Sequence, residues 1–479
     1  MGQQRGQGMR AGWHNLGALM LCSSLTVPAL ASPQQDALQA IIGDPKAVNA
    51  PGCAAGMFRN GKTVFLGTSG SGDIAQATPL TADTPFYAAS VAKQFTVLAA
   101  ARLVEAGQLR LDDDVRKYLP ELPQYAAPVT VEMLINHSSG IRDSLVLLNF
   151  AGVEDASQSS LEQALQLMFR QKETNFVPGT AYSYSNGGYL LLGEVIARAA
   201  GMPFHIYAQR AIFDPLGMKG SVFIAGKPAP GTVTNGYVPE DLGWKASNAF
   251  PSFSGSGGMI TTVNDMARYD HDIAVGHKVW TPAVTRTMLT AGNFTTGGPV
   301  ISPHFDSMPY AGGLVVGTRR GKPFIYHLGS FESFRTGYAR LPERNLGVAI
   351  LCNRSDALPL RRIDAMLDVV EPGYLEPYAN YRPTATKPLV IPPSPVLPQP
   401  GTYASEELNA TYEVAVSGDS VTAVITSPWQ GNVRRMLIYT RDAAGVLRGE
   451  DSSMSVSADG RGITLHNGRV FALQLKKVS

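Results

Sequence analysis

The sequence predicts an α+β protein, in which a mixed domain of strands and helices is followed by a small antiparallel β domain of barrel-like form. Apolar strand-like runs stand near both ends of the first part of the chain, with helical patterns between them, so one sheet is expected to join distant segments. A proline-rich stretch follows. Beyond it, apolar and polar residues alternate between spaced glycines, which is typical of short antiparallel strands.

The first strands are expected at residues 53–58 and 63–66, which are apolar runs joined across Asn60-Gly61. Both turn residues tolerate positive φ, so this segment predicts a hairpin. Strand-like runs return late in the domain and are expected to complete the sheet. They lie at residues 323–327, 334–341 and 346–353.

A buried helix is predicted over residues 90–106. The segment is apolar on nearly every face, contains no glycine or proline, and is followed by Gly107 as a candidate C-cap. Further helical patterns lie at residues 161–170, 188–200 and 263–273.

Composition divides the chain into four segments. Seven prolines fall within residues 383–400, too many for a helix or a strand ladder, so this segment is predicted to be an extended linker. It separates a main domain at residues 32–382 from a C-terminal β domain at residues 401–479.

Residues 1–31 have the pattern of a secretory signal peptide. Arg5 and Arg10 precede a mostly apolar stretch at residues 16–27, and small residues stand at Ala29 and Ala31. The alternative is an anchoring helix, but the stretch is shorter than the ~20 residues that span a bilayer. We expect an exported bacterial protein, periplasmic or secreted, whose mature chain has no transmembrane segment.

The formal net charge of +2 provides no clustered basic excess, which argues against nucleic-acid and anionic-membrane partners. The sequence contains no H-E-x-x-H pair, G-x-S-x-G elbow or G-x-G-x-x-G fingerprint. We therefore expect no metal site.

Three cysteines occur, and Cys22 would leave with the signal peptide. Cys53 and Cys352 both lie in apolar, strand-like runs. They could form a bridge in an oxidising compartment, but we favour two buried small hydrophobic side chains.

The tetrad Ser90-Val91-Ala92-Lys93 starts the buried helix, and its i to i+3 spacing puts the hydroxyl and the amine on one face. A serine hydroxyl needs a base to become a nucleophile. Burial disfavours the charged form of lysine, so Lys93 is a candidate base for Ser90. The alternative is a lysine whose head reaches solvent.

Two further motifs complete a candidate site. Tyr184-Ser185-Asn186 precedes the helical segment at 188–200, where the phenol can relay a proton and the carboxamide can orient the lysine and a substrate amide. His327-Leu328-Gly329 ends a strand-like run, where the imidazole can donate to substrate and the glycine lets substrate lie close to the strand. Tyr378-Ala379-Asn380 and His466-Asn467-Gly468 fit the same loose patterns but are expected to lie beyond the core.

With these motifs in this order, the chain resembles the serine β-lactamase and penicillin-binding protein superfamily, in the branch of class C β-lactamases, DD-carboxypeptidases, D-aminopeptidases and esterases. The resemblance implies a five-stranded antiparallel sheet flanked by helices, a helical subdomain closing over the cleft, and no cofactor. The segments that carry it, between about residues 51 and 353, are FYAASVAKQFT, GQLRLDDDVRKYLPEL, LINHSSGI, YSYSNGGYLLLGEVI, SGSGGMITTVNDMARY and HLGSFESFRTGYARLPERNLGVAILCN.

The resemblance implies a role for each matching position. Ser90 would be the acylated nucleophile and Lys93 its base, alone or shared with Tyr184. Asn186 would hold Lys93 and the substrate amide. The remaining substrate-binding candidates are His327 and Gly329 of the third motif, the backbone N–H groups of Ser90 and Ser330 as an oxyanion hole, and Arg335, which would meet an anionic substrate group or stay a solvated strand-edge arginine.

The third motif departs from the class C pattern. Those enzymes have lysine-threonine-glycine at the third motif, where ammonium and hydroxyl engage a substrate carboxylate, whereas this chain has His327 and Leu328. With a histidine at this position, the third motif resembles that of D-aminopeptidases, some peptidases and esterases. His137 is expected to belong to a structural turn, and residues 255–258 to line one wall of the cleft.

The sequence thus predicts an exported serine hydrolase that forms an acyl-enzyme at Ser90 on amide or ester bonds, like D-aminopeptidases, peptidases or esterases. Its partner would be a small molecule or peptide: a D-amino acid amide or peptide, an ester, or a peptidoglycan fragment. One alternative is a non-catalytic binder of peptidoglycan or peptides, and another is a weak β-lactamase or DD-carboxypeptidase. The role of the β domain and the oligomeric state stay open.

Overall fold

The computed structural model describes Gly2 and residues 32–303, 307–319, 321–375, 391–429 and 434–478. Apart from Gly2, the predicted signal peptide lies outside the described residues, as do Tyr378-Ala379-Asn380 and the first part of the predicted linker. Residues 391–400 contain neither helix nor strand.

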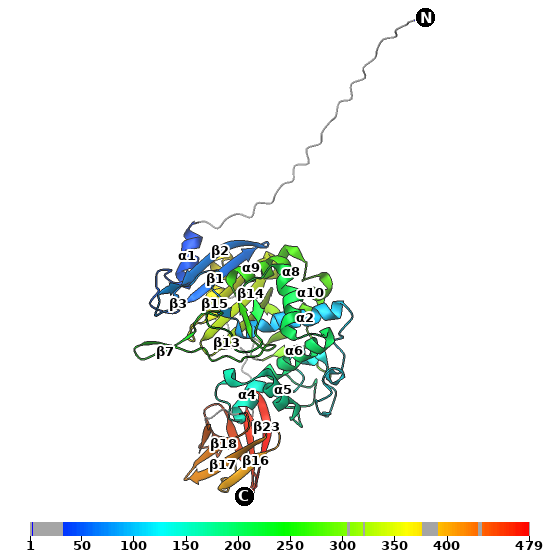
Figure 1. Cartoon of the computed structure of the whole chain (residues 1–479), viewed down its shortest axis with the longest axis vertical. Helices are drawn as coiled ribbons and strands as arrows, with labels where there is room; N and C mark the ends of the chain where they lie inside the picture. Colours follow the sequence, from blue (N-terminus) through cyan, green and yellow to red (C-terminus); the bar gives the residue numbers. More distant parts are fainter. Residues whose placement is uncertain are drawn as a thin grey trace.

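One antiparallel sheet organises the main domain, with strand order β10-β11-β12-β13-β14-β15-β1-β2 (Figure 1). The N-terminal hairpin therefore pairs with the late strands, as predicted, because β1 lies between β15 and β2. The sheet has eight strands rather than five, since short strands such as β10 and β11 extend one edge. The strands are β10 (Ile301–Ser302), β11 (Met308–Ala311), β12 (Leu314–Arg319), β13 (Lys322–Phe331), β14 (Phe334–Leu341), β15 (Leu346–Cys352), β1 (Cys53–Arg59) and β2 (Lys62–Ser69).

The turn between β1 and β2 confirms the predicted hairpin. Asn60 has φ of 51° and Gly61 has φ of 70°, the left-handed conformation that a two-residue hairpin turn requires at both positions.

Alternate residues of β1 face two separate cores. Cys53, Ala55 and Met57 pack with α1 (Ser32–Ile42) and α11 (Pro359–Val370). Ala54 and Phe58 belong to the other core, which contains the apolar residues of α2 and α9. Both faces of the sheet are therefore covered, which explains why β1 and β15 are apolar along nearly their whole length.

The predicted helices are present. Residues 89–91 form a 3₁₀ turn that leads into α2 (Ala92–Glu105), a largely buried helix, and Gly107 follows with φ of 70°. Among the helices that the structure describes, none is long and apolar enough to cross a membrane. The other elements used below are α4 (Ser144–Phe150), α5 (Leu161–Phe169), α6 (Asn186–Ala200) and α9 (Val263–His271).

The C-terminal strands β16 to β23 close into an antiparallel barrel, which lies beside α4 and α5 at one end of the molecule (Figure 1). Ion pairing ties the barrel to the main domain, since the buried Arg142 Nη1 lies 2.9 Å from Glu407 Oε1. The strands are β16 (Gly401–Ser405), β17 (Ala410–Ser417), β18 (Ser420–Thr426), β19 (Met436–Arg441), β20 (Leu447–Arg448), β21 (Ser453–Val456), β22 (Gly462–Asn467) and β23 (Val470–Lys477).

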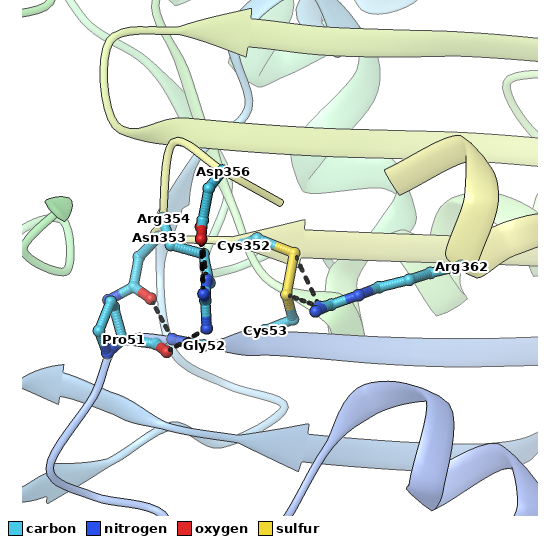
Figure 2. Close-up of a disulfide and its surroundings, with 8 residues drawn as sticks. All are labelled: Pro51, Gly52, Cys53, Cys352, Asn353, Arg354, Asp356 and Arg362. Carbon is cyan, nitrogen blue, oxygen red and sulfur yellow. Dashed lines mark hydrogen bonds and ion pairs between the residues drawn. A yellow bond between two sulfur atoms is a disulfide. The ribbon is translucent and has the colours of Figure 1, made fainter. Parts of the chain in front are cut away.

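A disulfide joins Cys53 and Cys352, so our preference for two free cysteines was wrong (Figure 2). The two residues are direct partners across β1 and β15, with Cα atoms 4.0 Å apart. This pairing brings together positions 299 residues apart, which no local pattern reveals. Arg362 of α11 points at the bridge, and its Nη1 lies 2.6 Å from Cys53 Sγ.

Candidate active site

The turn that carries Ser90 is held in a strained conformation against the sheet. Ala89 has φ of 48°, which a residue with a side chain adopts at a cost. Strand β13 passes so close that a Cβ at Gly329 would lie 2.5 Å from the Ala88 carbonyl oxygen and 2.1 Å from Thr336 Oγ1. Gly329 thus lets the strand approach the Ser90 turn, rather than making room for substrate as we had expected.

Lys93 is wholly buried, so the alternative of a solvent-reaching lysine is wrong. Its Nζ lies 2.9 Å from Asn186 Oδ1, 2.5 Å from the Ser256 carbonyl oxygen and 3.3 Å from Ser90 Oγ. Desolvation lowers the pKa of Lys93 well below its usual value, against the opposing charge of Asp143. A neutral amine fits these contacts, because its two N–H groups reach the two acceptors and its lone pair is left for the Ser90 hydroxyl.

The Tyr184 ring lies beside this pair, and Lys93 Nζ is 4.8 Å from its centroid. Burial raises the pKa of Tyr184, and hydrogen bonding with the Ser90 side chain opposes this only in part. The side chain therefore remains a phenol, which can donate a proton near Ser90 Oγ. The structure thus brings together the three side chains that the sequence selected from two distant motifs.

Asp143 fixes the orientation of Asn186, a role that sequence analysis missed. The backbone N and the Nδ2 of Asn186 donate to Asp143 Oδ2 at 2.8 and 2.9 Å. With its amide nitrogen held in this way, Asn186 presents its oxygen to Lys93. Asp143 is itself fixed as the N-cap of α4, where its Oδ1 accepts from the backbone N–H groups of Leu145 and Val146. An aspartate directly before a helical segment was the signal in the sequence that could have indicated Asp143.

His137 has a structural role, consistent with the prediction. It is buried, and its Nδ1 accepts a hydrogen bond of 3.1 Å from the backbone N–H of Ser185. Ser185 in turn caps α6 by accepting from Gly188 N. His137 therefore positions the segment that carries Tyr184 and Asn186.

His327 does not face substrate, which corrects our expectation. The side chain is buried, with Nε2 3.0 Å from the Tyr310 hydroxyl and Nδ1 2.7 Å from the Leu328 carbonyl oxygen. Burial and the nearby Lys93 lower the pKa of His327 to about 3. A neutral imidazole with N–H on Nδ1 fits both contacts, so His327 supports the wall behind Tyr184 and supplies no charge to the site.

A cavity of about 580 Å³ opens in front of Ser90. Ser256 and Gly257 line it, which confirms two of the four positions in the wall predicted at residues 255–258, and Ser330 lines it as well. Tyr87 and Phe331 give it an aromatic side. The other lining residues are Ala89, Leu145, Tyr184, Asn186, Pro251, Leu328, Asn467, Gly468 and Arg469.

The last three of these residues belong to the barrel, where residues 466–468 were expected, but the expectation that they lie away from the site was wrong for Asn467 and Gly468. Asn467 ends β22, and Gly468 and Arg469 form the turn to β23 that lines the cavity. Arg469 Cζ lies 4.9 Å from the Tyr184 ring centroid, and its Nη1 is 3.7 Å from Asp143 Oδ2. Nothing in the sequence indicates which turn of the barrel meets the main domain.

Arg335, the candidate for an anionic substrate group, bonds to its own hairpin. Its Nη1 donates to the carbonyl oxygens of Glu332 and Phe334, at 2.6 and 2.9 Å. It is absent from the lining of the cavity. Within the described part of the chain, no group of three or more His, Cys, Asp or Glu residues is placed to hold a metal ion.

Comparisons with known proteins agree with this geometry. Residues 38–371 match the family described as Beta-lactamase. The D-aminopeptidase of Cereibacter sphaeroides strain ATCC 17023 is 28% identical over 312 residues, and that of Brucella anthropi is 28% identical over 298. These matches cover 64% and 61% of this chain, and 58% and 54% of the relatives, so the chain spans less than two thirds of their length.

Solved structures share the fold. The D-amino acid amidase from Ochrobactrum anthropi SV3, complexed with D-phenylalanine, matches with a TM-score of 0.60 and 23% identity over 71% of this chain and 99% of its own. The octameric penicillin-binding protein homologue from Pyrococcus abyssi matches with a TM-score of 0.58 and 23% identity over 89% of this chain and 96% of its own. With the family match over residues 38–371, the Ser90–Lys93 turn and the sheet beside it show that this chain belongs to the beta-lactamase family.

Proposed function

We propose that this protein is an exported serine hydrolase that cleaves the amide bond of D-amino acid amides or short peptides through an acyl-enzyme at Ser90. The observation that carries the proposal is the buried amine of Lys93, 3.3 Å from Ser90 Oγ. Relatives named D-aminopeptidase and a similar fold named D-amino acid amidase support the substrate class. Ester substrates are the second expectation, because the same chemistry cleaves them more easily.

The proposed reaction begins when Lys93 Nζ takes the proton of Ser90 and the Ser90 oxygen attacks the substrate carbonyl carbon. The backbone N–H groups of Ser90 and Ser330 stabilise the resulting oxyanion. Tyr184 donates its proton to the leaving nitrogen as the C–N bond breaks, and the proton on Lys93 restores the phenol. Water then attacks the acyl-enzyme by the same proton path, which releases the acid and the free serine.

Asn186 has two parts to play in this proposal. Its oxygen accepts from Lys93, and its position in the lining of the cavity lets it meet the substrate amide. Asp143 acts through Asn186 and is a positioning residue. His327 is proposed to shape the site from behind Tyr184, because its ring nitrogens are engaged by Tyr310 and Leu328.

Export is supported by two independent features. Residues 1–31 have the composition of a signal peptide, and the Cys53–Cys352 disulfide suits an oxidising compartment. The mass of the mature protein from the periplasm or medium tests this part, since export by a cleaved signal removes residues 1–31. A cytoplasmic protein that retains them would contradict it.

The test of the catalytic proposal is the intact mass after treatment with a fluorophosphonate. The wild type should gain one adduct, and Ser90→Ala should gain none. Ser330→Ala is the matched control, because it removes another hydroxyl of the cavity but keeps the backbone N–H, and it should still be labelled. Turnover of D-alanine anilide, a p-nitrophenyl ester and nitrocefin, run in parallel, then ranks the substrates. A wild type that forms no adduct and turns over none of them would be a non-catalytic binder.

A further inference from the structure

We propose that Arg469 of the barrel recognises a carboxylate on the leaving group of the substrate, and so supplies the charge that the third motif lacks. This inference rests on the proposed function. It assigns the barrel a part in substrate selection, and it narrows the substrate class to peptides that release an amino acid with a free carboxylate.

Charge at the site is the first argument. Among the described residues that line the cavity, Arg469 alone carries a formal charge at neutral pH. His327 occupies the third-motif position but is buried and neutral, and Arg335 is bonded to its own hairpin. A carboxylate entering this cavity therefore has one cationic partner among these residues.

The second argument is that the Arg469 guanidinium retains its donors. Its contact with Asp143 is long, at 3.7 Å, and is an ion pair rather than a hydrogen bond. Asp143 is already satisfied by four N–H groups, two from Asn186 and one each from Leu145 and Val146. The side chain of Arg469 is 47% exposed, so the planar fork can bind a carboxylate in the bidentate manner that arginine favours.

The third argument concerns how the arginine is held. The Arg469 carbonyl oxygen accepts from Asp143 N at 3.2 Å and from Asn175 Nδ2 at 3.0 Å. Asn175 Oδ1 also accepts from Phe471 N, at 2.8 Å. The main domain therefore holds the backbone at Arg469 and directly after the turn, at Phe471, and so fixes the position from which the guanidinium extends.

The position of Arg469 indicates which part of the substrate carries the carboxylate. The guanidinium lies against the Tyr184 ring, with Cζ 4.9 Å from the centroid, and Tyr184 is the proposed proton donor to the leaving nitrogen. A second cavity of about 470 Å³ begins beyond Arg469, and the two cavities share Leu145, Asn467 and Arg469. The leaving group therefore meets Arg469 first and has space behind it.

The test compares two substrates with the same acyl part, D-alanyl-D-alanine and D-alanyl-D-alaninamide, which differ only in the charge of the leaving group. The wild type should have at least a tenfold higher kcat/KM for the acid. Arg469→Gln should lower kcat/KM for the acid at least tenfold and for the amide less than about threefold. Arg469→Lys keeps the charge but not the planar guanidinium. Its kcat/KM for the acid should lie between the values of wild type and Arg469→Gln. Arg448→Gln removes a barrel arginine outside both cavity linings and should keep the wild-type ratio.

Failure of this inference and failure of the proposed function give different results. A wild type that prefers the amide or treats both alike would overturn the role of Arg469, and this comparison does not depend on whether a variant folds. Equal losses of kcat/KM on both substrates in Arg469→Gln would also overturn it, because they would indicate that Arg469 supports the Tyr184 side chain and does not bind the carboxylate. If the wild type cleaves neither peptide and takes no fluorophosphonate at Ser90, the proposed function itself is wrong.

Discussion

Two basic side chains flank the Tyr184 ring, one from the main domain and one from the barrel. Lys93 Nζ lies 4.8 Å from the ring centroid and Arg469 Cζ lies 4.9 Å from it. Lys93 is wholly buried, whereas the Arg469 side chain is 47% exposed. Burial disfavours the ammonium, so Lys93 is suited to take a proton, and the exposed guanidinium stays charged and is suited to bind an anion. Residue type and solvent exposure together separate the two roles, because a buried lysine can lose its proton whereas an arginine keeps its charge.

Substitutions at the buried Ser90–Lys93 pair should have the largest effect on activity. Ser90→Ala and Lys93→Met should each lower kcat/KM by roughly 10⁴- to 10⁶-fold, because each removes one half of the nucleophile–base pair. The double variant should lose little more than either single one, which steady-state kinetics on one ester substrate will show. A double variant with a much larger loss would mean that the two residues act independently.

Tyr184→Phe should have the next largest effect, a loss of roughly 10²- to 10⁴-fold in kcat on an anilide, because proton donation to the leaving nitrogen is removed. On a p-nitrophenyl ester, whose leaving group needs no proton, the loss should be much smaller. The ratio of the two losses is the measurement. Equal losses on both substrates would indicate that the phenol serves the attack step or packing instead.

The pH dependence of kcat/KM should report the charge state of Lys93. The pKa of Lys93 is lowered, so its neutral form is present above that pKa, and activity should fall about tenfold per unit as pH decreases below it. Asp143→Asn removes a charge that raises the pKa of Lys93, and should move this acid limb to lower pH. A limb that moves to higher pH in this variant would contradict the electrostatic assignment.

A smaller effect is expected from Asp143→Asn on kcat, roughly tenfold, since Asn186 loses the carboxylate that fixes its amide and α4 loses part of its N-cap. Asp114→Asn is a matched control, because it alters the capping carboxylate of a 3₁₀ turn instead, and should leave kcat within about twofold. An unchanged kcat in Asp143→Asn would remove Asp143 from the positioning of Asn186.

The smallest effect on activity is expected from the disulfide, because its cysteines pack in the core with α1 and α11, on the face of the sheet opposite the core that contains α2. Cys53→Ser with Cys352→Ser should reduce the free energy of unfolding by about 2–5 kcal/mol, because the bridge closes a long loop. The kcat should stay within a few fold. Denaturant unfolding of the variant and of wild type, with and without reductant, provides the measurement. A loss of activity without a loss of stability would link the bridge to the site.

The sequence predicted the features that depend on neighbouring residues. The hairpin at Asn60-Gly61, the buried helix that begins near Ser90 and the Ser90–Lys93 spacing all follow from local pattern. The resemblance then brought Tyr184 and Asn186 to the same site, and the geometry agrees. These features can be predicted from the sequence because each depends on contacts within a few residues or on a motif.

The features that sequence analysis missed depend on pairing between distant segments. The Cys53–Cys352 bridge requires the register of β1 against β15, and the entry of Arg469 into the cleft requires the barrel to dock beside α4. His327 was misjudged for a related reason, since only the packed structure shows Tyr310 and the Leu328 carbonyl at its two nitrogens. The structure places His327 inside β13, and the direction of a side chain within a strand is not contained in a three-residue motif.

The charge state of Lys93 is the most direct test of this account. The ¹³Cε resonance of Lys93 can be followed by NMR in protein labelled with ¹³C-lysine, assigned by its loss in Lys93→Met, while pH is raised from acid to alkaline. The account predicts that Lys93 is already neutral at pH values where the exposed lysines are charged. A Lys93 resonance that titrates together with the exposed lysines, near their usual pKa of about 10.4, would contradict it.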